Sequence, residues 1–329
     1  KRSLTLDLKN KAGLAAFRKL AETADIIVEN FRPGVKKRLG IDYDTLSKTN
    51  PGLIYASISG FGQDGPLADR PGFDQIAQGM GGLMSITGTP GEGPMRVGIP
   101  LADLCAGLFA AQGIMIALLE RATSGKGQWI QTSLLQAQVF MLDFQAARYL
   151  MDGDIPKQAG NNHPTSIPTG VFRTSDGHMN IAVTGNNIWA SFARILGRET
   201  WLTDERYATA PARSDNRDAL GAEIEATLKT NTTAHWIDLF TGAGVPAGEI
   251  NDIGQVFAEP QVRHLGLAQP VTSQERGETE LVGQPIIMSR TPSHIATPPP
   301  LAGQHSVEIL TEIGLSSDEI EEMRASGAT

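Results

Sequence analysis

The feature that most constrains this fold is a long apolar run that follows a single carboxylate. Between Leu104 and Leu119, small and large apolar side chains cover nearly every helical face, and Gln112 interrupts them. A helix that is apolar all round needs neighbours on all sides, so we expect it to be buried in a core. A membrane span is the weaker alternative, because the run is short of the ~20 residues that a bilayer needs.

Asp103 stands where this helix is expected to begin, and its role has two interpretations. In the first, it is an N-cap residue whose side chain accepts hydrogen bonds from the first free N–H groups. In the second, the helix dipole keeps the carboxylate ionised and the residue acts as a nucleophile. Cys105, two residues later, is expected to be a packing residue and not a reactive thiol.

Strand and helix patterns alternate through the first part of the chain. Strands are predicted over 4–8, 24–30, 53–59 and 128–133, and helices over 11–24, 35–39, 43–48, 73–84 and 134–150. This alternation is typical of a parallel sheet covered by helices. We therefore predict an α/β fold class, with a Rossmann-like parallel sheet in a large domain.

The composition changes after residue 153, where a second domain is expected to begin. A hairpin is predicted from 170–174 and 178–183, followed by helices over 187–196, 213–229 and 233–242, two strand-like runs within 268–289 and two terminal helices. We divide the chain into a large domain over 1–155, a smaller α+β domain over 156–265, and a segment over 266–329 that returns to the large domain. The last helix carries a capping-box signature from Ser316 to Glu319.

Charge and residue usage exclude several classes of partner. The net charge of −8 argues against nucleic acid or an anionic membrane as the main partner. The single cysteine excludes a disulfide framework and fits a reducing compartment, so we expect a cytoplasmic protein. The six histidines are scattered without metal-ligand spacing, and no metal site is expected.

The segment from Gly60 to Gly65 reads as G-x-G-x-x-G, but its context does not suit a dinucleotide fingerprint. Such a fingerprint must open a helix that receives the pyrophosphate, whereas here Pro66 and further loop residues follow. We interpret these glycines as a mobile loop at the carboxyl end of a strand, where open α/β sheets bind their ligands.

Several stretches resemble the class III CoA-transferases, a family that includes formyl-CoA transferase, carnitine CoA-transferase and the α-methylacyl-CoA racemases. They are Lys1–Lys9, Val28–Gly34, the Gly60–Pro66 loop with Gly72–Asp74, and Asp103 with Ser124–Gln128. The resemblance covers essentially the whole chain. It implies an interlocked homodimer that uses CoA as a substrate and not as a permanent cofactor. The family's opening strand and helix precede Lys1, so we expect either a truncated sequence or a longer native chain.

The resemblance also implies roles for individual residues. Asp103 matches the catalytic aspartate of the transferases. Positions implied to contact CoA are Asn30, Phe31 and Arg38, with Leu6 and Lys9, and with Phe73 and Asp74 near the nucleotide. At 71 and 73 some relatives have Lys and Tyr, where this chain has Pro71 and Phe73. The racemase branch of the family has Gly-His-Asp where this chain has Gly72-Phe73-Asp74. A racemase needs an acid and a base beside the α-carbon, and phenylalanine can be neither.

These matches predict a transferase that moves CoA from an acyl-CoA donor to a carboxylic acid. The Asp103 carboxylate would attack the donor thioester to give a mixed anhydride, and the thiolate would return to give an aspartyl-CoA thioester. Gly60 and Gly62 are expected near the acyl group, because glycine-rich loops bring backbone N–H groups close to an oxyanion. The alternatives are a racemase and a CoA-binding protein without catalysis.

The acceptor is expected to be a dicarboxylate. The resemblance through Asn162-His163, Gly170–Thr174 and Phe257–Pro260 is to the branch of succinyl-CoA:glutarate CoA-transferases. A second carboxylate needs a cation, for which we select Arg96, with Arg148 and His163 as reserves. The alternative for Arg96 is a surface arginine in a turn. The resemblance also disfavours oxalate as the acceptor, because the formyl/oxalate branch carries a longer glycine-rich segment where this chain has only residues 160–169.

Overall fold

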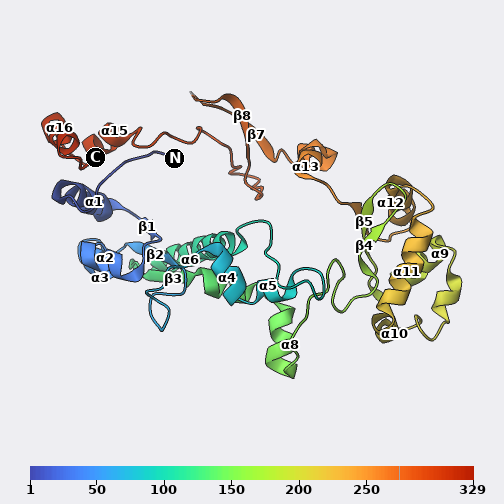
Figure 1. Cartoon of the computed structure of the whole chain (residues 1–329). Helices are drawn as coiled ribbons and strands as arrows, with labels where there is room; N and C mark the ends of the chain where they lie inside the picture. Colours follow the sequence, from blue (N-terminus) through green and yellow to red (C-terminus); the bar gives the residue numbers. More distant parts are fainter. Residues whose placement is uncertain (274) are drawn as a thin grey trace. The chain divides into compact units, whose positions relative to one another are not determined.

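The computed structural model of the chain describes residues 1–273 and 275–329, which form two compact units (Figure 1). The first unit contains residues 1–86, 94–156 and 269–329, and the second contains residues 87–93 and 157–268. The chain therefore leaves the first unit twice and returns to it twice. The two units are described in turn.

The first unit is organised around a parallel sheet of three strands in the order β1-β2-β3. They are β1 (Ile26–Glu29), β2 (Ile54–Ser59) and β3 (Trp129–Ser133). Both pairs are parallel, with Val28 opposite Ala56 and Ala56 opposite Ile130. The central strand β2 is almost entirely buried. The predicted α/β class with a parallel sheet is confirmed.

Helices precede and connect these strands close to the predicted positions, but two short helices replace the single one predicted over 73–84. The helices are α1 (Lys11–Thr23), α2 (Pro33–Leu39), α3 (Tyr43–Leu46), α4 (Asp74–Met80), α5 (Leu83–Ile86) and α6 (Leu101–Ser124). Asn10 caps α1 by accepting a hydrogen bond from the Ala12 N–H. Gly40, with φ of 63°, ends α2 in the left-handed conformation.

The strand predicted over residues 4–8 is wrong. This segment runs beside the C-terminal helices α15 (Ser306–Glu312) and α16 (Ser317–Ala325), where the Asp7 N–H donates to the Ala328 carbonyl at 2.9 Å. Leu4 and Leu6 pack in the small core that these helices form. The alternating pattern is thus used by an extended segment that packs against helices, and the two chain ends lie close together (Figure 1). The predicted capping box of α16 is confirmed.

The long helix predicted over 134–150 is two helices, α7 (Leu134–Phe140) and α8 (Phe144–Asp152). Asp143 between them has φ of 47°, a backbone conformation that cannot continue a right-handed helix. Apolar periodicity alone does not reveal such a break, because both helices carry apolar side chains.

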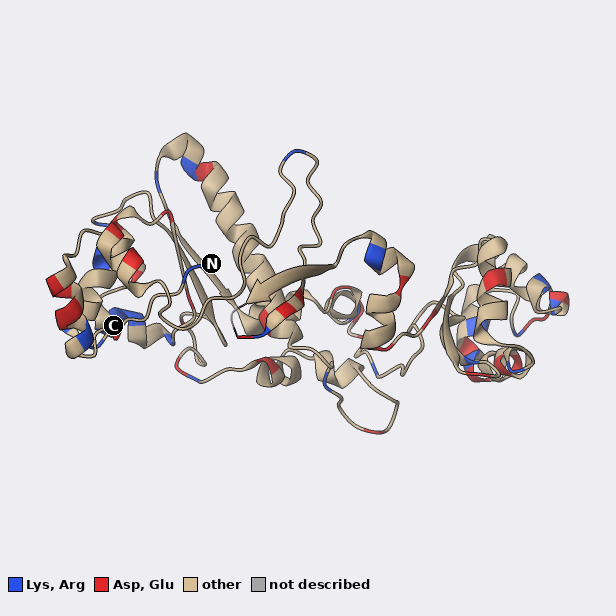
Figure 2. Ribbon diagram, turned by 90° about the horizontal axis from the view of Figure 1, so that it is seen from above, with Lys and Arg blue, Asp and Glu red and all other residues tan. Residues whose placement is uncertain are grey.

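Helix α6 is buried along one face only, so the prediction of burial on all sides is wrong for the described chain. Its buried residues are Ala102, Cys105, Ala106, Ala110 and Ala117. Leu108 and Leu119, by contrast, are 70% and 74% exposed. In Figure 2 this longest helix carries no charged side chain over most of its length.

By length and composition alone, α6 could cross a membrane. Its buried face, however, packs on β2 and β3 of an open parallel sheet. Open sheet edges have no hydrogen-bond partners in hydrocarbon, so a helix in this setting is the central helix of an α/β layer. The membrane alternative is therefore not favoured by the packing of this helix.

The second unit contains an antiparallel sheet of β4 (Thr169–Arg173), β5 (His178–Ala182) and β6 (Ala247–Glu249). The predicted hairpin is confirmed. Around it lie α9 (Gly185–Ile195), a 3-10 helix (Glu199–Leu202), α10 (Ala210–Asp215), α11 (Arg217–Leu228) and α12 (Thr233–Gly242). Two short helices, α13 (Ile253–Ala258) and α14 (Pro260–His264), follow and pack against each other. The helix predicted over 213–229 is interrupted at Asn216, which separates α10 from α11.

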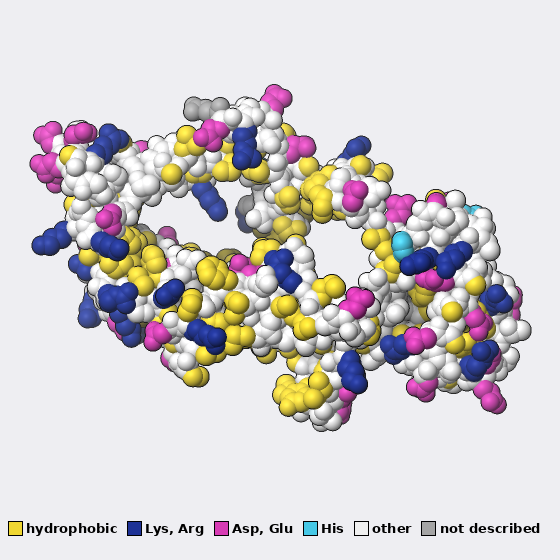
Figure 3. All heavy atoms as spheres, in the orientation of Figure 1, with side chains coloured by type: hydrophobic (Ala, Val, Ile, Leu, Met, Phe, Trp, Pro, Cys, Tyr) yellow, Lys and Arg dark blue, Asp and Glu magenta, His cyan; other side chains and the backbone are white. Residues whose placement is uncertain are grey.

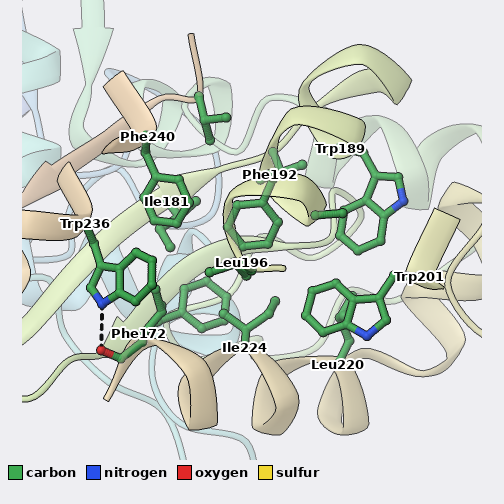
Figure 4. Close-up of a cluster of buried hydrophobic side chains, with 14 of the residues drawn as sticks. Phe172, Ile181, Trp189, Phe192, Leu196, Trp201, Leu220, Ile224, Trp236 and Phe240 are labelled. Carbon is green, nitrogen blue, oxygen red and sulfur yellow. Dashed lines mark hydrogen bonds between the residues drawn. The ribbon is translucent and has the colours of Figure 1, made fainter. Parts of the chain in front are cut away.

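Large aromatic side chains fill the core of the second unit (Figure 4). Phe192 stacks on Phe240 with ring centroids 5.3 Å apart, and Trp189 stacks on Trp201 at 5.7 Å. The Trp236 indole N–H donates to the Leu228 carbonyl at 2.8 Å, so its polar atom is satisfied inside the core.

A two-stranded sheet of β7 (Ala268–Ser273) and β8 (Gly277–Val282) follows the second unit. It confirms the two strand-like runs predicted within 268–289, of which Gln274 lies outside the described residues. The second strand ends at Val282.

Candidate functional site

A pocket of about 590 Å³ lies at the carboxyl ends of β1 and β2 in the first unit. Its walls are the Asn30–Pro33 turn after β1, the Ser59–Gly60 segment after β2 with the returning stretch Ala68–Phe73, and Asp103 of α6. Parallel strands end at the same edge of a sheet, so the loops that follow them meet there. The pocket thus occupies the position where open α/β sheets bind ligands.

Asp103 lies in the first turn of α6, but it does not cap the helix. The N-cap residue is Pro100, and the Asp103 carboxylate accepts no hydrogen bond from the residues that the structure describes. The capping role belongs to Asp74, whose Oδ1 accepts from the Ala102 N–H at 2.9 Å. The N-cap interpretation of Asp103 is therefore wrong, and its carboxylate faces the pocket without a partner.

Two effects raise the pKa of the Asp103 carboxyl above its ordinary value. Partial desolvation is the larger cause, and the nearby negative charge of Asp74 is the second. A more basic carboxylate is a stronger nucleophile, and a perturbed carboxyl in a pocket marks a candidate functional site. The surroundings therefore disfavour the ionised form of this carboxylate, contrary to the prediction of the dipole argument.

Asp74 anchors the segment that leads to Asp103. The residue is 7% exposed, and its carboxylate also accepts from Gln78 Nε2 at 2.8 Å and from Arg96 Nη2 at 3.4 Å. These protein donors engage both of its oxygens, so Asp74 acts here as a structural anchor beside the pocket. Contact between Asp74 and CoA stays a prediction.

Arg96, selected as the cation for a second carboxylate, pairs with Asp74 and is not among the residues that line the Asp103 pocket. Its side chain is 37% exposed. Two other arginines, Arg32 and Arg70, do line the pocket. Neither guanidinium has an ion-pair partner within the described chain. Arg32 lies in the Val28–Gly34 stretch already singled out, and Arg70 precedes Pro71, a position already compared with relatives.

The base of the glycine-rich loop is closely packed. A Cβ added at Gly60 would lie 2.7 Å from the Cα of Gly72, and a Cβ added at Gly72 would lie equally close to Gly60. The Gly60 carbonyl accepts from the Leu135 N–H at 3.1 Å. Only glycine permits this approach, so the two ends of the loop lie against each other at the pocket wall. The Gly62 N–H donates to Ser59 Oγ at 3.0 Å. Gly62 is not among the residues that line the pocket.

Some of the remaining predicted residues line the pocket, and the others do not. Asn30, Phe31 and Phe73 line the pocket with Asp103, and Phe73 offers no ionisable group there. Arg38 lies over the first turn of α2, since its Nη1 would be 3.1 Å from a Cβ at Gly34.

Other predicted residues do not line this pocket. Leu6 packs against the C-terminal helices, and Lys9 is exposed. Arg148 pairs with Asp154. His163 belongs to the second unit, where its Nδ1 accepts from the Ser166 N–H at 2.9 Å and lines a separate pocket. Their roles with substrate stay predictions.

Comparison with known proteins gives concordant results. Residues 1–306 match the family model for CoA-transferase family III. The chain is 41% identical over 317 residues to a succinate–glutarate CoA-transferase of Agrobacterium fabrum, which covers 95% of this chain and 78% of that protein. It is 40% identical over 262 residues to an acetyl-CoA:oxalate CoA-transferase of Acetobacter aceti, covering 79% of this chain and 67% of that protein.

A solved structure with a similar fold is that of a CAIB/BAIF family protein from Brucella suis. It superposes with a TM-score of 0.83 at 37% sequence identity, covering 95% of this chain and 82% of that one.

Proposed function

Because this chain belongs to CoA-transferase family III, we propose that it moves CoA from succinyl-CoA to a dicarboxylic acid through covalent intermediates on Asp103. The observation that carries the proposal is the Asp103 carboxylate, which faces a pocket at the end of a parallel sheet without a hydrogen-bond partner among the described residues. The names of both relatives support a carboxylic acid as the acceptor.

The first half of the reaction transfers CoA from the donor to the enzyme. An oxygen of Asp103 attacks the thioester carbon of the donor, the C–S bond breaks, and CoA leaves as a thiolate. The product is a mixed anhydride between the donor acyl group and Asp103. The thiolate then attacks the Asp103 acyl carbon, which releases the donor acid and leaves an aspartyl-CoA thioester.

The second half runs the same steps with the acceptor. The acceptor carboxylate attacks the aspartyl thioester, which frees the thiolate and forms a second anhydride. The thiolate attacks the acceptor carbonyl of that anhydride, and the Asp103 carboxylate is regenerated. One thioester is exchanged for another, so the reaction needs no other energy source. Water must be excluded, because both intermediates hydrolyse.

The pocket offers a guanidinium for the second carboxylate of a dicarboxylic acid. Arg70 lines the same pocket as Asp103, and its side chain has no ion-pair partner in the described part of the chain. A guanidinium can hold a carboxylate through two parallel hydrogen bonds. We therefore propose Arg70 as a second candidate, in addition to Arg96, for binding the second carboxylate.

An acceptor panel tests this proposal. With succinyl-CoA as donor, we expect glutarate and other dicarboxylates to exceed monocarboxylates of the same length, and oxalate in the panel tests the other relative's acceptor. Loss of a charged hydrogen bond in Arg70→Ala is expected to raise the dicarboxylate KM about 10- to 100-fold, with a smaller effect on monocarboxylates. Arg96→Ala is the matched variant. Faster transfer to monocarboxylates, or an unchanged dicarboxylate KM in both variants, would contradict the proposed acceptor.

We also propose that the enzyme is a homodimer. Large apolar side chains gather on the exposed surface of α8, as Figure 3 shows, and Leu150 and Met151 are 79% and 82% exposed. The outer face of α6 is also apolar and exposed. Exposed apolar area of this kind marks a protein interface, and a second copy is the partner implied by the family resemblance. Light scattering that finds a fully active monomer would contradict the dimer.

A further inference from the structure

One lysine in the first unit is almost completely buried. Lys36, on α2, is 1% exposed, and its ammonium is 5.1 Å from the centre of the Trp129 ring. Nζ donates to Glu29 Oε1 at 2.8 Å, to Ser57 Oγ at 2.9 Å and to Gln63 Oε1. An ammonium has three protons, so these three acceptors use all of them.

Two of these acceptors, Glu29 and Gln63, belong to the segments that lead into the two walls of the Asp103 pocket. Glu29 ends β1, and its other oxygen accepts from the Phe31 N–H at 2.8 Å, in the turn that forms one wall. Gln63 lies in the loop whose two limbs, at Gly60 and Gly72, form the other wall. One buried ammonium therefore connects the turn after β1 to the loop after β2.

The orientation of the Gln63 amide follows from the donor that it meets. An ammonium can only donate, so Oε1 of Gln63 must face Lys36. The Nε2 atom of Gln63 is buried and has no partner among the described residues. An unpaired buried donor costs free energy, so this side chain is held in place by Lys36 and not by contacts of its own amide N–H groups.

We infer that the chain Glu29–Lys36–Gln63 is a positioning device that fixes the separation of the two walls of the Asp103 pocket. A buried ion pair seldom stabilises a protein more than apolar side chains of the same volume would. Its hydrogen bonds are directional, however, and they fix the relative positions of the groups that they join. A loop with several glycines loses much conformational entropy when it is ordered. The hydrogen bond from Lys36, which lies outside the loop, offsets part of this cost. The inference rests on the proposed function of Asp103.

This device predicts a specific defect when the tie to the loop is removed. Without the Lys36–Gln63 hydrogen bond the loop opens more often, and water reaches the covalent intermediates. Water then attacks the anhydride or the aspartyl thioester, so that an acid and free CoA thiol form in place of the new acyl-CoA. The ratio of hydrolysis to transfer therefore reports on the position of the loop.

The test compares variants at position 63 in the purified enzyme. Gln63→Leu removes the acceptor at similar size, and Lys36 keeps Glu29 and Ser57 as partners. Because a hydrogen bond to a charged group is lost, we expect the hydrolysis-to-transfer ratio to rise about tenfold, together with a lower thermal midpoint because one proton of the buried ammonium loses its acceptor. Gln63→Glu retains an acceptor for Lys36 and is expected to restore a low ratio. Asp64→Asn, at the next and exposed position, is the control.

An unchanged ratio in Gln63→Leu would overturn the positioning role, as would an equal rise in Asp64→Asn. Should Gln63→Leu fold poorly, Gln63→Ala provides the same measurement. Hydroxylamine trapping separates this inference from the proposed function. If the wild-type enzyme forms no adduct on Asp103, the proposed function fails. If it does, and Gln63→Leu partitions like wild type, only the positioning role fails.

Discussion

The core of the second unit and the cluster beside Asp103 in the first unit are built from different side chains. In the second unit the core is one cluster of large residues, with Trp189, Phe192, Trp201, Trp236 and Phe240 at its centre. The core around Asp103 in the first unit is small, and alanines make up most of it: Ala77, Ala102, Ala106 and Ala137, with Cys105 and Leu134.

This difference shows how the second unit and the region around the pocket are stabilised. Burial of a large aromatic side chain removes much apolar area from water, so the second unit gains most from packing. Alanines remove little area, but they let α4, α6 and α7 approach closely around the pocket. The site region therefore depends more on directed polar contacts, those of Asp74 with Ala102 and of Lys36 with Glu29, than on the size of its core.

The largest effect is expected from a truncation in the aromatic core. Phe240 is fully buried and stacks on Phe192 and on Trp236. Phe240→Ala is expected to lower the free energy of unfolding by about 3–5 kcal/mol, through lost burial and a residual cavity. Denaturant unfolding measures this, with Leu239→Ala at the neighbouring 44% exposed position as the control. Equal losses in both variants would contradict the comparison.

A smaller effect is expected when the alanine core is enlarged. Ala106 is completely buried on the inner face of α6, where neighbouring backbones lie close. Ala106→Leu is expected to cost about 1–3 kcal/mol by overpacking and to shift the helix that carries Asp103. Unfolding and transfer rates are measured together, with the 70% exposed Leu108→Ala as the control on the same helix. A stabilised and fully active Ala106→Leu enzyme would show that this core is not closely packed.

The smallest effect is expected from one charge beside the pocket. Asp74 raises the pKa of Asp103, so Asp74→Asn should lower that pKa while Oδ1 still accepts from the Ala102 N–H. Transfer needs ionised Asp103, which is lost as pH falls through this pKa, and the acid limb of kcat/KM should therefore move to lower pH. Glu120→Gln, at the far end of α6, is the control. A limb that stays in place or moves to higher pH would exclude this electrostatic contribution.

Local patterns predicted much of the fold. Apolar periodicity located β1 to β3 and most helices, because these elements bury one face of a regular pattern. It failed where tertiary contacts decide the structure: residues 4–8 pack on helices, and the positive φ of Asp143 divides a predicted helix. The apolar outer face of α6 was predicted to be buried. An apolar pattern indicates that a face needs neighbours, but it does not reveal whether the same chain supplies them.

The site was predictable where chemistry follows a motif. Asp103, Asn30 and Phe31 were identified from short stretches, and the structure brings them to one pocket. The tie between Lys36 and Gln63 was missed, because residues 27 positions apart meet only after β1 and β2 pair. A lysine within a short helix reads as a surface residue, and only the fold reveals that it is buried.

The central claim is that Asp103 forms a covalent bond to the acyl group. Incubation of the enzyme with succinyl-CoA and hydroxylamine, followed by peptide mass spectrometry, tests it directly. We expect a hydroxamate on Asp103 that requires succinyl-CoA and is absent in Asp103→Asn. We also expect that variant to remain folded, because the Asp103 carboxylate has no hydrogen-bond partner among the described residues. Transfer without an adduct on Asp103, or near-wild-type turnover in Asp103→Ala, would contradict the account.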